Sequence, residues 1–442
     1  MYCALGQEES QQVGESLEGF VGLLARWLDE RLDKRLVRTF MLTLKAILVL
    51  RHTKYGLLLS ELGAYILTAD KAPAGTKRLS NLLRSTKWSY RLIEDFLWQQ
   101  AKAQVQSLME KDGSALLVWD ESVIEKPESL ALEGLGPVRS SKAARLKRIK
   151  PGYFNPPGGK PVFVPGMQWI CLMVCGMVGV PALAAMRWWT SRGPLASDKR
   201  AQESMLLKQC AQEWGSKVVH IWDRGFASSA WLGCAFQEQV RFIVRWQSKY
   251  HLVDEKGQRN TWKIIRGKRS QDYRMVWDFN RRCFRKTGII AVPVKHPEHD
   301  HPLWLVVSRP GKGRKPWYLL TNEPINSLED AWRIVFSYAR RWQVEMAYRY
   351  SKTELAMESP RLWRWENRLK LLLLVSLVYA FLLSLLTDTQ KSLVQLLLRH
   401  WCHRTGERHR QAAIPLYRLR SALSRLWLTY PPQLRFISLN SG

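Results

Sequence analysis

Residues 115–120 read ALLVWD, and residues 218–223 read VVHIWD. Each stretch is a short apolar run that ends on an aspartate, Asp120 in the first and Asp223 in the second. Such runs predict buried strands, and parallel α/β sheets place their functional groups at the ends of strands. Gly225 then permits a tight turn into the next helix. The two stretches therefore predict an α/β fold with both carboxylates placed at strand ends.

The segments around these two strands also indicate a mixed α/β fold. Residues 168–188 predict a strand hairpin, 198–214 a helix and 240–246 a further strand. Residues 250–315 alternate strand-like segments (TWKIIRG, YRMVWDF, GIIAVPV, LWLVVS) with turn residues, which predicts a β-rich insertion.

The chain before residue 110 is basic and has helical apolar spacing, with a break expected at 72–75. Its segment 78–100 predicts a helix pair that lays Arg84, Lys87 and Arg91 along DNA. The alternative is an ordinary helical bundle with a charged exterior.

A helix predicted from Ser327 to beyond Lys352 carries the best candidate for a functional face. Tyr338, Arg341, Glu345 and Lys352 are spaced 3, 4 and 7 residues apart, which places them within about 60° of one another at 100° per residue. A carboxylate between two cations suits a metal site whose cations grip phosphates. The alternative is a solvated face on which Arg341 and Glu345 form an i,i+4 pair. With Asp120 and Asp223 added, three carboxylates are available to two Mg²⁺ ions.

The overall composition points to a polyanionic partner. Lys and Arg outnumber Asp and Glu by 68 to 38, a formal net charge of +30, and nucleic acid is the commonest partner of such a protein. Residues 134–197 contain no acidic residue at all. The seven Cys include no CxxC pair, which predicts neither a disulfide framework nor a zinc ribbon. The first residues lack a signal-type apolar core, so we expect a cytoplasmic protein.

Three further stretches of the sequence can be interpreted in more than one way. Residues 371–386 form a continuous apolar run just short of the roughly 17–25 residues of a membrane span. A buried core helix explains this run equally well, and we expect that helix to pack under the sheet. The two remaining stretches, 296–301 and 400–409, contain His-rich sets that resemble metal ligands, but their spacing is poor for a zinc site.

The helical face at 338–352 matches a known signature. Tyr338-x2-Arg341-x3-Glu345-x6-Lys352 resembles, without gaps, the Y-x2-R-x3-E-x6-K signature of the insertion-sequence-four family of transposases, whose best-known relative is the transposon-five enzyme. Trp119-Asp120-Glu121-Ser122 resembles the family's first-Asp block, and Asp223-Arg224-Gly225-Phe226 resembles its second. The resemblance spans about residues 110 to 390, and the two Asp blocks are less specific than the signature.

The resemblance implies an RNase H-like catalytic core that is interrupted by a β insertion. It implies Mg²⁺, or Mn²⁺ in its place, bound at Asp120, Asp223 and Glu345. Tyr338, Arg341, Lys352 and Arg224 are then expected to hold the DNA backbone near the cut. In relatives that cleave through a DNA hairpin, a Trp before an L-L-T-x-E-P segment stacks on a flipped base, and Trp317 stands in that place here. Family members act as dimers in a synaptic complex, and the amphipathic C-terminal helix is a candidate for part of that contact.

Together, these observations divide the chain into five regions. We expect a helical N-terminal DNA-binding region (1–110), the first part of an RNase H-like core (111–250), a β-rich insertion (251–315), the completion of the core with the Glu345 helix (316–388) and a basic helical C-terminal region for dimerisation or DNA contact (389–442).

The expected function is cut-and-paste DNA transposition by two-metal phosphoryl transfer. The expected DNA partners are terminal inverted repeats and target DNA, at the nucleoid of a bacterial cytoplasm. The alternatives are an RNase H-like nuclease without strand transfer and a catalytically silent DNA-binding protein derived from a transposase.

Overall fold

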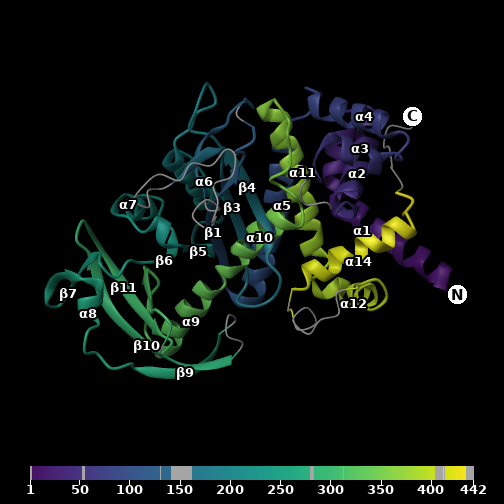
Figure 1. Ribbon diagram of the computed structural model, residues 1–442. Helices are drawn as coiled ribbons and strands as arrows, with labels where there is room; N and C mark the ends of the chain where they lie inside the picture. Colours follow the sequence, from purple (N-terminus) through teal and green to yellow (C-terminus); the bar gives the residue numbers. More distant parts are fainter. Residues whose placement is uncertain are drawn as a thin grey trace.

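The computed structural model describes residues 2–51, 55–129, 131–140, 162–278, 283–311, 313–403, 412 and 414–434 (Figure 1). Part of the stretch that lacks acidic residues, residues 141–161 with the basic segment 141–150 and the loop 156–161, lies outside the described residues. The same holds for His409 of the second His-rich set.

Twelve strands in the described part of the chain form one sheet. Its order is β2-β3-β1-β5-β6-β12-β11-β10-β7-β8, with β4 paired to β3 and β9 paired to β10. The strands are β1 (Ala115–Glu125), β2 (Gly136–Arg139), β3 (Phe163–Cys175), β4 (Ala182–Trp189), β5 (Val218–Trp222), β6 (Arg241–Arg245), β7 (His251–Asp254), β8 (Gly257–Asn260), β9 (Asp272–Asp278), β10 (Cys283–His296), β11 (His299–Arg309) and β12 (Trp317–Thr321). Only β1, β5 and β6 run parallel to one another, and the other pairs are antiparallel. The mixed α/β class that the sequence predicts is therefore present, in a sheet that is mostly antiparallel.

The parallel pairing of β1 and β5 brings the two aspartates into register. Val118 pairs with Ile221, and Asp120 and Asp223 each follow two residues later. Asp223 directly follows the end of β5, as predicted. The prediction that Asp120 ends its strand is wrong, because antiparallel pairing with β3 carries β1 on to Glu125. The apolar run stops at Trp119, but the backbone hydrogen bonds to β3 do not depend on side-chain polarity.

Strand alternation decides which face of the sheet carries the aspartates. Along β1, Leu116 and Val118 belong to one hydrophobic core, whereas Leu117 and Trp119 belong to the core on the other side. Asp120 keeps the parity of Leu116 and Val118, since successive side chains of a strand point to opposite faces. It therefore faces the same side as those two residues.

The strands between residues 251 and 309 extend the same sheet. β12 hydrogen-bonds to β6 on one side and to β11 on the other, so β11 and β10 continue outward from the parallel strands. Three of the four segments predicted as strands here are strands. The fourth prediction, TWKIIRG, is wrong, because Thr261–Ile264 forms the short helix α8. A short apolar run does not distinguish the two states by itself.

Helices cover both faces of the sheet (Figure 1). One face carries α6 (Lys199–Trp214) and α7 (Ser229–Gln237), and the other carries α9 (Leu328–Ala339), α10 (Trp342–Thr353) and α11 (Trp365–Ser384). The helix α5 (Arg91–Asp112) contributes buried side chains to the cores on both faces. Beyond α5 and α11 lie α1 (Tyr2–Asp29), α2 (Lys34–Val49), α3 (Leu59–Ile66), α4 (Ala72–Arg84), α12 (Lys391–His400) and α14 (Leu416–Thr429). The break predicted at 72–75 is wrong, because these residues form the first turn of α4, where Pro73 is tolerated.

The apolar run 371–386 lies in α11, at the centre of the molecule. By length and composition α11 is the one helix in the described part of the chain that passes for a membrane span, but 89% of its most apolar window is buried inside the protein. It packs between β4 on one side and the helices α2, α5 and α14 on the other. Its place beside the sheet agrees with the expected core helix.

The C-terminal helix α14 also belongs to this core. Its apolar face is buried within the same chain, and its residues are Leu416, Leu419, Leu423 and Leu426. The proposal that this face helps to join two subunits is therefore not supported, because the face is already covered by helices that include α2 and α12. The hydroxyl of Ser10 in α1 bonds to the carbonyl of Tyr430, and Glu9 accepts from the indole N–H of Trp401.

Candidate active site

The three predicted carboxylates come from three different elements. Asp120 lies in β1, Asp223 directly follows β5 before the short helix η4 (Arg224–Phe226), and Glu345 lies in the first turn of α10. Arg341, just before α10, lies among them. Its Nη1 atom is 3.4 Å from Asp120 Oδ2, and its Nη2 atom contacts Glu345 Oε1. The structure thus brings Asp120 and Glu345 onto one guanidinium.

A tight turn between α9 and α10 places Arg341 there. The predicted single helix from Ser327 to Lys352 is wrong, since α9 ends at Ala339 and α10 begins at Trp342. Around the join, Arg340, Arg341, Gln343 and Val344 each bond to the carbonyl three residues earlier. This short 3₁₀-type stretch tightens the helix, and such stretches inside helices often mark functional positions. The start of α9 is as predicted, with a complete capping box between Ser327 and Asp330.

Arg341 is the electrostatic centre of the site. Its side chain is only 12% exposed. Burial alone lowers the pKa of a guanidinium, but Tyr338, Asp223, Glu345 and Asp120 outweigh that effect and raise the pKa of Arg341 above its ordinary value. A fixed positive charge therefore stands where three carboxylates converge.

Asp120 is the most strongly perturbed member of the set. Its pKa is raised to about 7, mainly by burial and also by the nearby carboxylates of Asp223 and Glu345, against the lowering effects of Arg341 and of the backbone N–H of Glu121. That N–H donates to Asp120 Oδ1 at 2.9 Å. A carboxyl group in this state ionises near neutral pH and favours any cation that reaches it.

Tyr338 links the third carboxylate to the set. Its hydroxyl donates to Asp223 Oδ1 at 3.3 Å, and burial raises the pKa of this phenol above its ordinary value. Trp317, at the start of β12, stands edge-on to the Tyr338 ring with centroids 5.2 Å apart. The indole that the sequence singled out is therefore in contact with the site.

Lys352 and Arg224, the two other cations predicted to contact DNA, differ in their surroundings. Lys352 Nζ donates to Ser122 Oγ at 2.8 Å and to the carbonyl oxygen of Val123 at 2.6 Å, so it fastens α10 to β1 just beyond Asp120. Arg224 is exposed at the start of η4, next to Asp223. Lys352 is therefore held by the protein, whereas Arg224 faces solvent.

Tyr348 is a site residue that the sequence reading missed. Its hydroxyl donates to the backbone carbonyl of Asp120, and its ring stands edge-on to Trp169 at 4.6 Å. Tyr348 follows Glu345 by three residues, so helical spacing alone places it beside that carboxylate. This three-residue spacing is the sequence feature that could have identified Tyr348 as a site residue.

A buried aromatic layer under the two aspartates was missed as well. It consists of Trp119, Trp222, Phe226 and Trp231. Trp119 donates from Nε1 to His220 Nδ1 at 3.0 Å, and burial lowers the pKa of His220 to about 3. The layer is therefore neutral at physiological pH and holds the ends of both Asp-bearing segments in place.

Glu121, although it is adjacent to Asp120, belongs to another group on the opposite face of the sheet. It contacts Lys199, and it lies beside the fully buried Glu203 of α6, whose pKa is raised by burial and by Glu121 itself. Arg200 Nη1 bonds to Glu203 Oε2 at 2.7 Å. The group ties α6 to β1 and stands apart from the three carboxylates.

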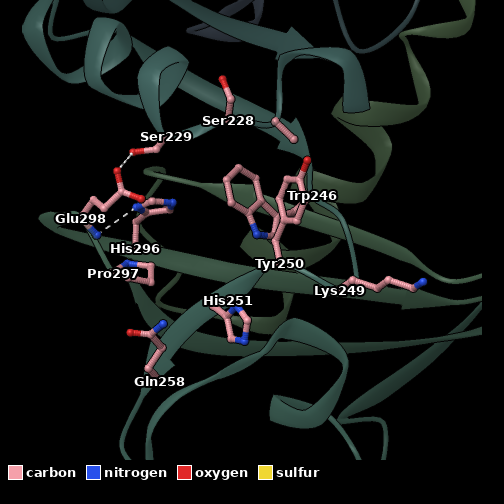
Figure 2. A pocket seen from close by; sticks show the side chains of 11 residues that line it. Ser228, Ser229, Trp246, Lys249, Tyr250, His251, Gln258, His296, Pro297 and Glu298 are labelled. Atoms are coloured by element: carbon pink, nitrogen blue, oxygen red, sulfur yellow. Dashed lines mark hydrogen bonds between the residues drawn. The ribbon is translucent and has the colours of Figure 1, made fainter.

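Three residues of the first His-rich set, His296, Pro297 and Glu298, line a pocket of about 420 Å³ (Figure 2). The backbone N–H of Glu298 donates to His296 Nδ1 at 3.2 Å, and Ser229 Oγ donates to Glu298 Oε2 at 2.6 Å. The pocket also contains Trp246, Tyr250 and nearby polar side chains. These two hydrogen bonds engage His296 Nδ1 and Glu298 Oε2 within the protein. In the second set, His400 Nδ1 lies 2.8 Å from Glu9 Oε1, and His403 bonds to Ser421.

Within the described ranges, no group of three or more His, Cys, Asp or Glu side chains is arranged to hold a metal ion. At the carboxylate set the reason is visible, because Arg341 already contacts two of the three acids. The donor chemistry nevertheless fits Mg²⁺, which prefers carboxylate oxygens and takes one or two carboxylates per ion. The guanidinium supplies the positive charge that a metal would supply.

No protein-family model matches the chain. Among solved structures, the cryo-EM structure of a piggyBac transposase synaptic complex with hairpin DNA is similar to it, with a TM-score of 0.39 and 14% sequence identity. The match covers 89% of this chain and 76% of that chain. At this level the likeness concerns the course of the backbone alone.

Proposed function

We propose that the protein is a Mg²⁺-dependent DNA transposase of the insertion-sequence-four type, with Asp120, Asp223 and Glu345 as metal ligands. One observation carries the proposal. Three carboxylates from segments far apart in the chain lie around Arg341, and Arg341 and Glu345 stand at their positions in the family signature. A structural ion pair needs only one acid for each cation. Here three acids lie near one guanidinium, and the pKa of one of them, Asp120, is raised, which points to a functional site.

The proposed catalytic core is RNase H-like. We assign to it the antiparallel strands β4, β3 and β1 together with β5 and β6, which run parallel to β1. The chain leaves this unit after β6 and returns through β12 to α9 and α10. The strands between these points are then the β insertion, and α10 delivers Glu345 to the two aspartates.

The chemistry proposed is phosphoryl transfer without a covalent protein–DNA intermediate. When bound, Mg²⁺ or Mn²⁺ would lower the pKa of the attacking water or 3′-OH and stabilise the leaving oxygen. The protein residues prepare for this by position. Asp120 gives up its proton near neutral pH, Tyr338 orients Asp223, and Arg341 is available to a phosphate once a metal takes its place among the acids.

The proposed substrates are the terminal inverted repeats of the element and its target DNA, handled by a homodimer at the nucleoid of a bacterial cytoplasm. The formal net charge of +30 supports a nucleic-acid partner. Cationic side chains at Arg84, Lys87 and Arg91 in and between α4 and α5 are candidates for further backbone contacts.

The test uses a duplex that carries the sequences flanking the gene, with end cleavage and strand transfer of precut ends measured separately. We expect Asp120→Asn, Asp223→Asn and Glu345→Gln each to abolish both reactions while duplex binding stays within about twofold. Glu110→Gln, a matched change at an exposed carboxylate of α5, should leave both unchanged. Wild-type cleavage by Glu345→Gln would refute the site. Cleavage without strand transfer by the unmodified protein would show a nuclease.

A further inference from the structure

The strands β9 and β10 expose four large apolar side chains on one face of a two-stranded ribbon. Tyr273 is 52% exposed, Met275 60%, Trp277 40% and Phe284 62%. The first three alternate along β9, so they share one face. Phe284 pairs directly with Trp277 across the ribbon and lies on the same face. Contiguous exposed apolar surface of this kind marks an interaction site.

The side chains on this face are ordered with respect to one another. The rings of Trp277 and Phe284 are 5.0 Å apart at 68°, and Lys286 Nζ lies 4.8 Å from the centre of the Tyr273 ring. Gly288 pairs with Tyr273, and a Cβ at this glycine would stand 2.9 Å from the Tyr273 ring. Gly288 therefore allows the ring to lie across the neighbouring strand. The outcome is a row of aromatic surfaces with a cation beside it.

The opposite face of the ribbon is fastened to α9. Asp272 accepts from Trp332 Nε1 at 2.8 Å, and the Arg274 guanidinium lies 5.2 Å from the Trp332 ring while it pairs with Glu329. Asp278, on the same side as Asp272, is bonded by Arg314 at 2.7 Å. The acidic groups of β9 thus point away from the aromatic face. The helix to which the ribbon is anchored carries Tyr338, which contacts Asp223, in its last turn.

We propose that this aromatic face is a stacking platform for the unpaired bases of a DNA strand, and that it lies on the path of that strand to the carboxylates. An aromatic ring stacks only on a base whose face is free, and paired, stacked bases hide their faces. Tyr273 and Trp277 are four residues apart along β9, a separation of about 13.6 Å, roughly four times the 3.4 Å rise between stacked bases. Successive rings therefore suit bases that have left the duplex stack.

Charge distinguishes DNA from a second copy of the chain as the occupant. Lys286 lies on the face itself, and Lys268 and Arg269 are exposed where the chain approaches β9. A two-fold contact through this face would bring these like charges together, whereas a DNA strand brings phosphates to them. The source of the unpaired strand, a transposon end during cutting, rests on the function proposed above.

The experiment compares binding of a single-stranded dT20 oligonucleotide with binding of a duplex of the same length, by fluorescence anisotropy in EDTA. One variant combines Tyr273→Leu, Trp277→Leu and Phe284→Leu, which keeps an apolar surface but removes the rings. The matched variant combines Tyr273→Phe, Trp277→Phe and Phe284→Tyr, which keeps the rings. The protein is used at full length, and thermal melts establish that both variants are folded.

We expect the leucine variant to bind dT20 at least tenfold more weakly and the duplex within about twofold of wild type, whereas the ring-retaining variant stays near wild type for both. Equal dT20 affinity for all three proteins would overturn the proposal. Loss of dimer mass in the leucine variant, with dT20 binding intact, would assign the face to a second copy. The binding assay uses no metal and no specific transposon end. A negative result in it therefore does not bear on the cleavage test of the proposed active site, and a negative cleavage test does not bear on base stacking at this face.

Discussion

The hydroxyl of Tyr348 donates a hydrogen bond to the backbone carbonyl of Asp120 and so couples the helix of Glu345 to the strand of the first aspartate. Tyr348 is only 7% exposed, and its ring is held edge-on by Trp169. The distance between two of the three carboxylates is therefore controlled by a residue that has no acidic group.

This contact predicts the effect of Tyr348→Phe. The change leaves a buried carbonyl without this partner, and we expect the free energy of unfolding to fall by about 1–3 kcal/mol. We also expect the single-turnover cleavage rate to fall more than DNA affinity does, because the carboxylate spacing is loosened. Urea titration and quench-flow cleavage provide the two measurements. Tyr65→Phe, at an exposed tyrosine of α3, is the control. An unchanged rate with lowered stability would limit Tyr348 to a structural role.

The raised pKa of Asp120 predicts how stability depends on pH. In the folded protein Asp120 keeps its proton up to about pH 7, whereas in the unfolded chain it ionises near pH 4. The folded state binds more protons between these values, so this group destabilises the fold as the pH rises through that window, by up to about 1.4 kcal/mol per pH unit. In EDTA, Asp120→Asn should therefore lose less stability than wild type between pH 5 and 7. Parallel urea-derived stability curves for the two proteins would contradict this.

Arg341→Gln is expected to make the protein dependent on a metal for stability. Without the guanidinium three acids converge with no cation, and breaking such a buried arrangement costs about 3–5 kcal/mol. Millimolar Mg²⁺ should restore part of the loss and should raise the melting temperature of this variant more than that of wild type, since ligand binding stabilises the folded state. Arg349→Gln, on the exposed face of α10, should show neither effect. An identical response of Arg341→Gln and wild type to Mg²⁺ would argue against a metal at this position.

Lys352→Met separates a positioning role from a DNA contact. The ammonium group bonds to Ser122 and to Val123, and we expect its loss to lower the free energy of unfolding by about 1–3 kcal/mol. Because these groups already hold it, we expect the dependence of DNA affinity on salt to stay as in wild type. A salt slope reduced by about one would instead show that Lys352 contacts a phosphate. Urea unfolding and binding titrations at several salt concentrations give the two answers.

Trp317→Ala tests whether a flipped base stacks beside the site. The indole touches Tyr338 from the edge of β12, and we expect its loss to spare the first nick but to slow hairpin formation or resolution. A 2-aminopurine at the terminal base should then be less quenched in the variant complex. Trp317→Phe keeps a flat face and should retain most of the activity. A uniform decline of all steps, together with a stability loss of about 3–5 kcal/mol, would identify Trp317 as a core residue.

Local pattern was sufficient for the elements that carry the site, but not for their junctions. The apolar runs before Asp120 and Asp223 predicted two strands, which the structure pairs as neighbours, and the capping box at Ser327 predicted the start of α9. The turn at Arg340 and Arg341 could not be predicted, because both residues keep right-handed helical backbone angles and neither is Gly or Pro. A change of hydrogen-bond register without a sequence signal is visible only in the folded chain.

Contacts between segments that are far apart in the chain explain the remaining differences between the predictions and the structure. The stripe at Leu419 and Leu423 showed that one face of α14 is buried, but periodicity does not say what covers it. One of the covering helices, α2, lies far away in sequence, and its contact with α14 removes the face from use by another subunit. Similarly, the place of β12 inside the sheet is defined by pairing with β6, more than seventy residues earlier, and not by its own composition.

The contacts between α1 and the last helices also set an order of events during synthesis. Apolar side chains such as Leu17 in α1 and Leu44 in α2 leave the ribosome before α11 and α14, yet the core that buries them includes these two later helices. Until then the N-terminal helices expose surface that favours chaperones and aggregation. A chain that ends before Trp365 would therefore lack the helices that bury these side chains, and the quality-control proteases of the cell would clear it.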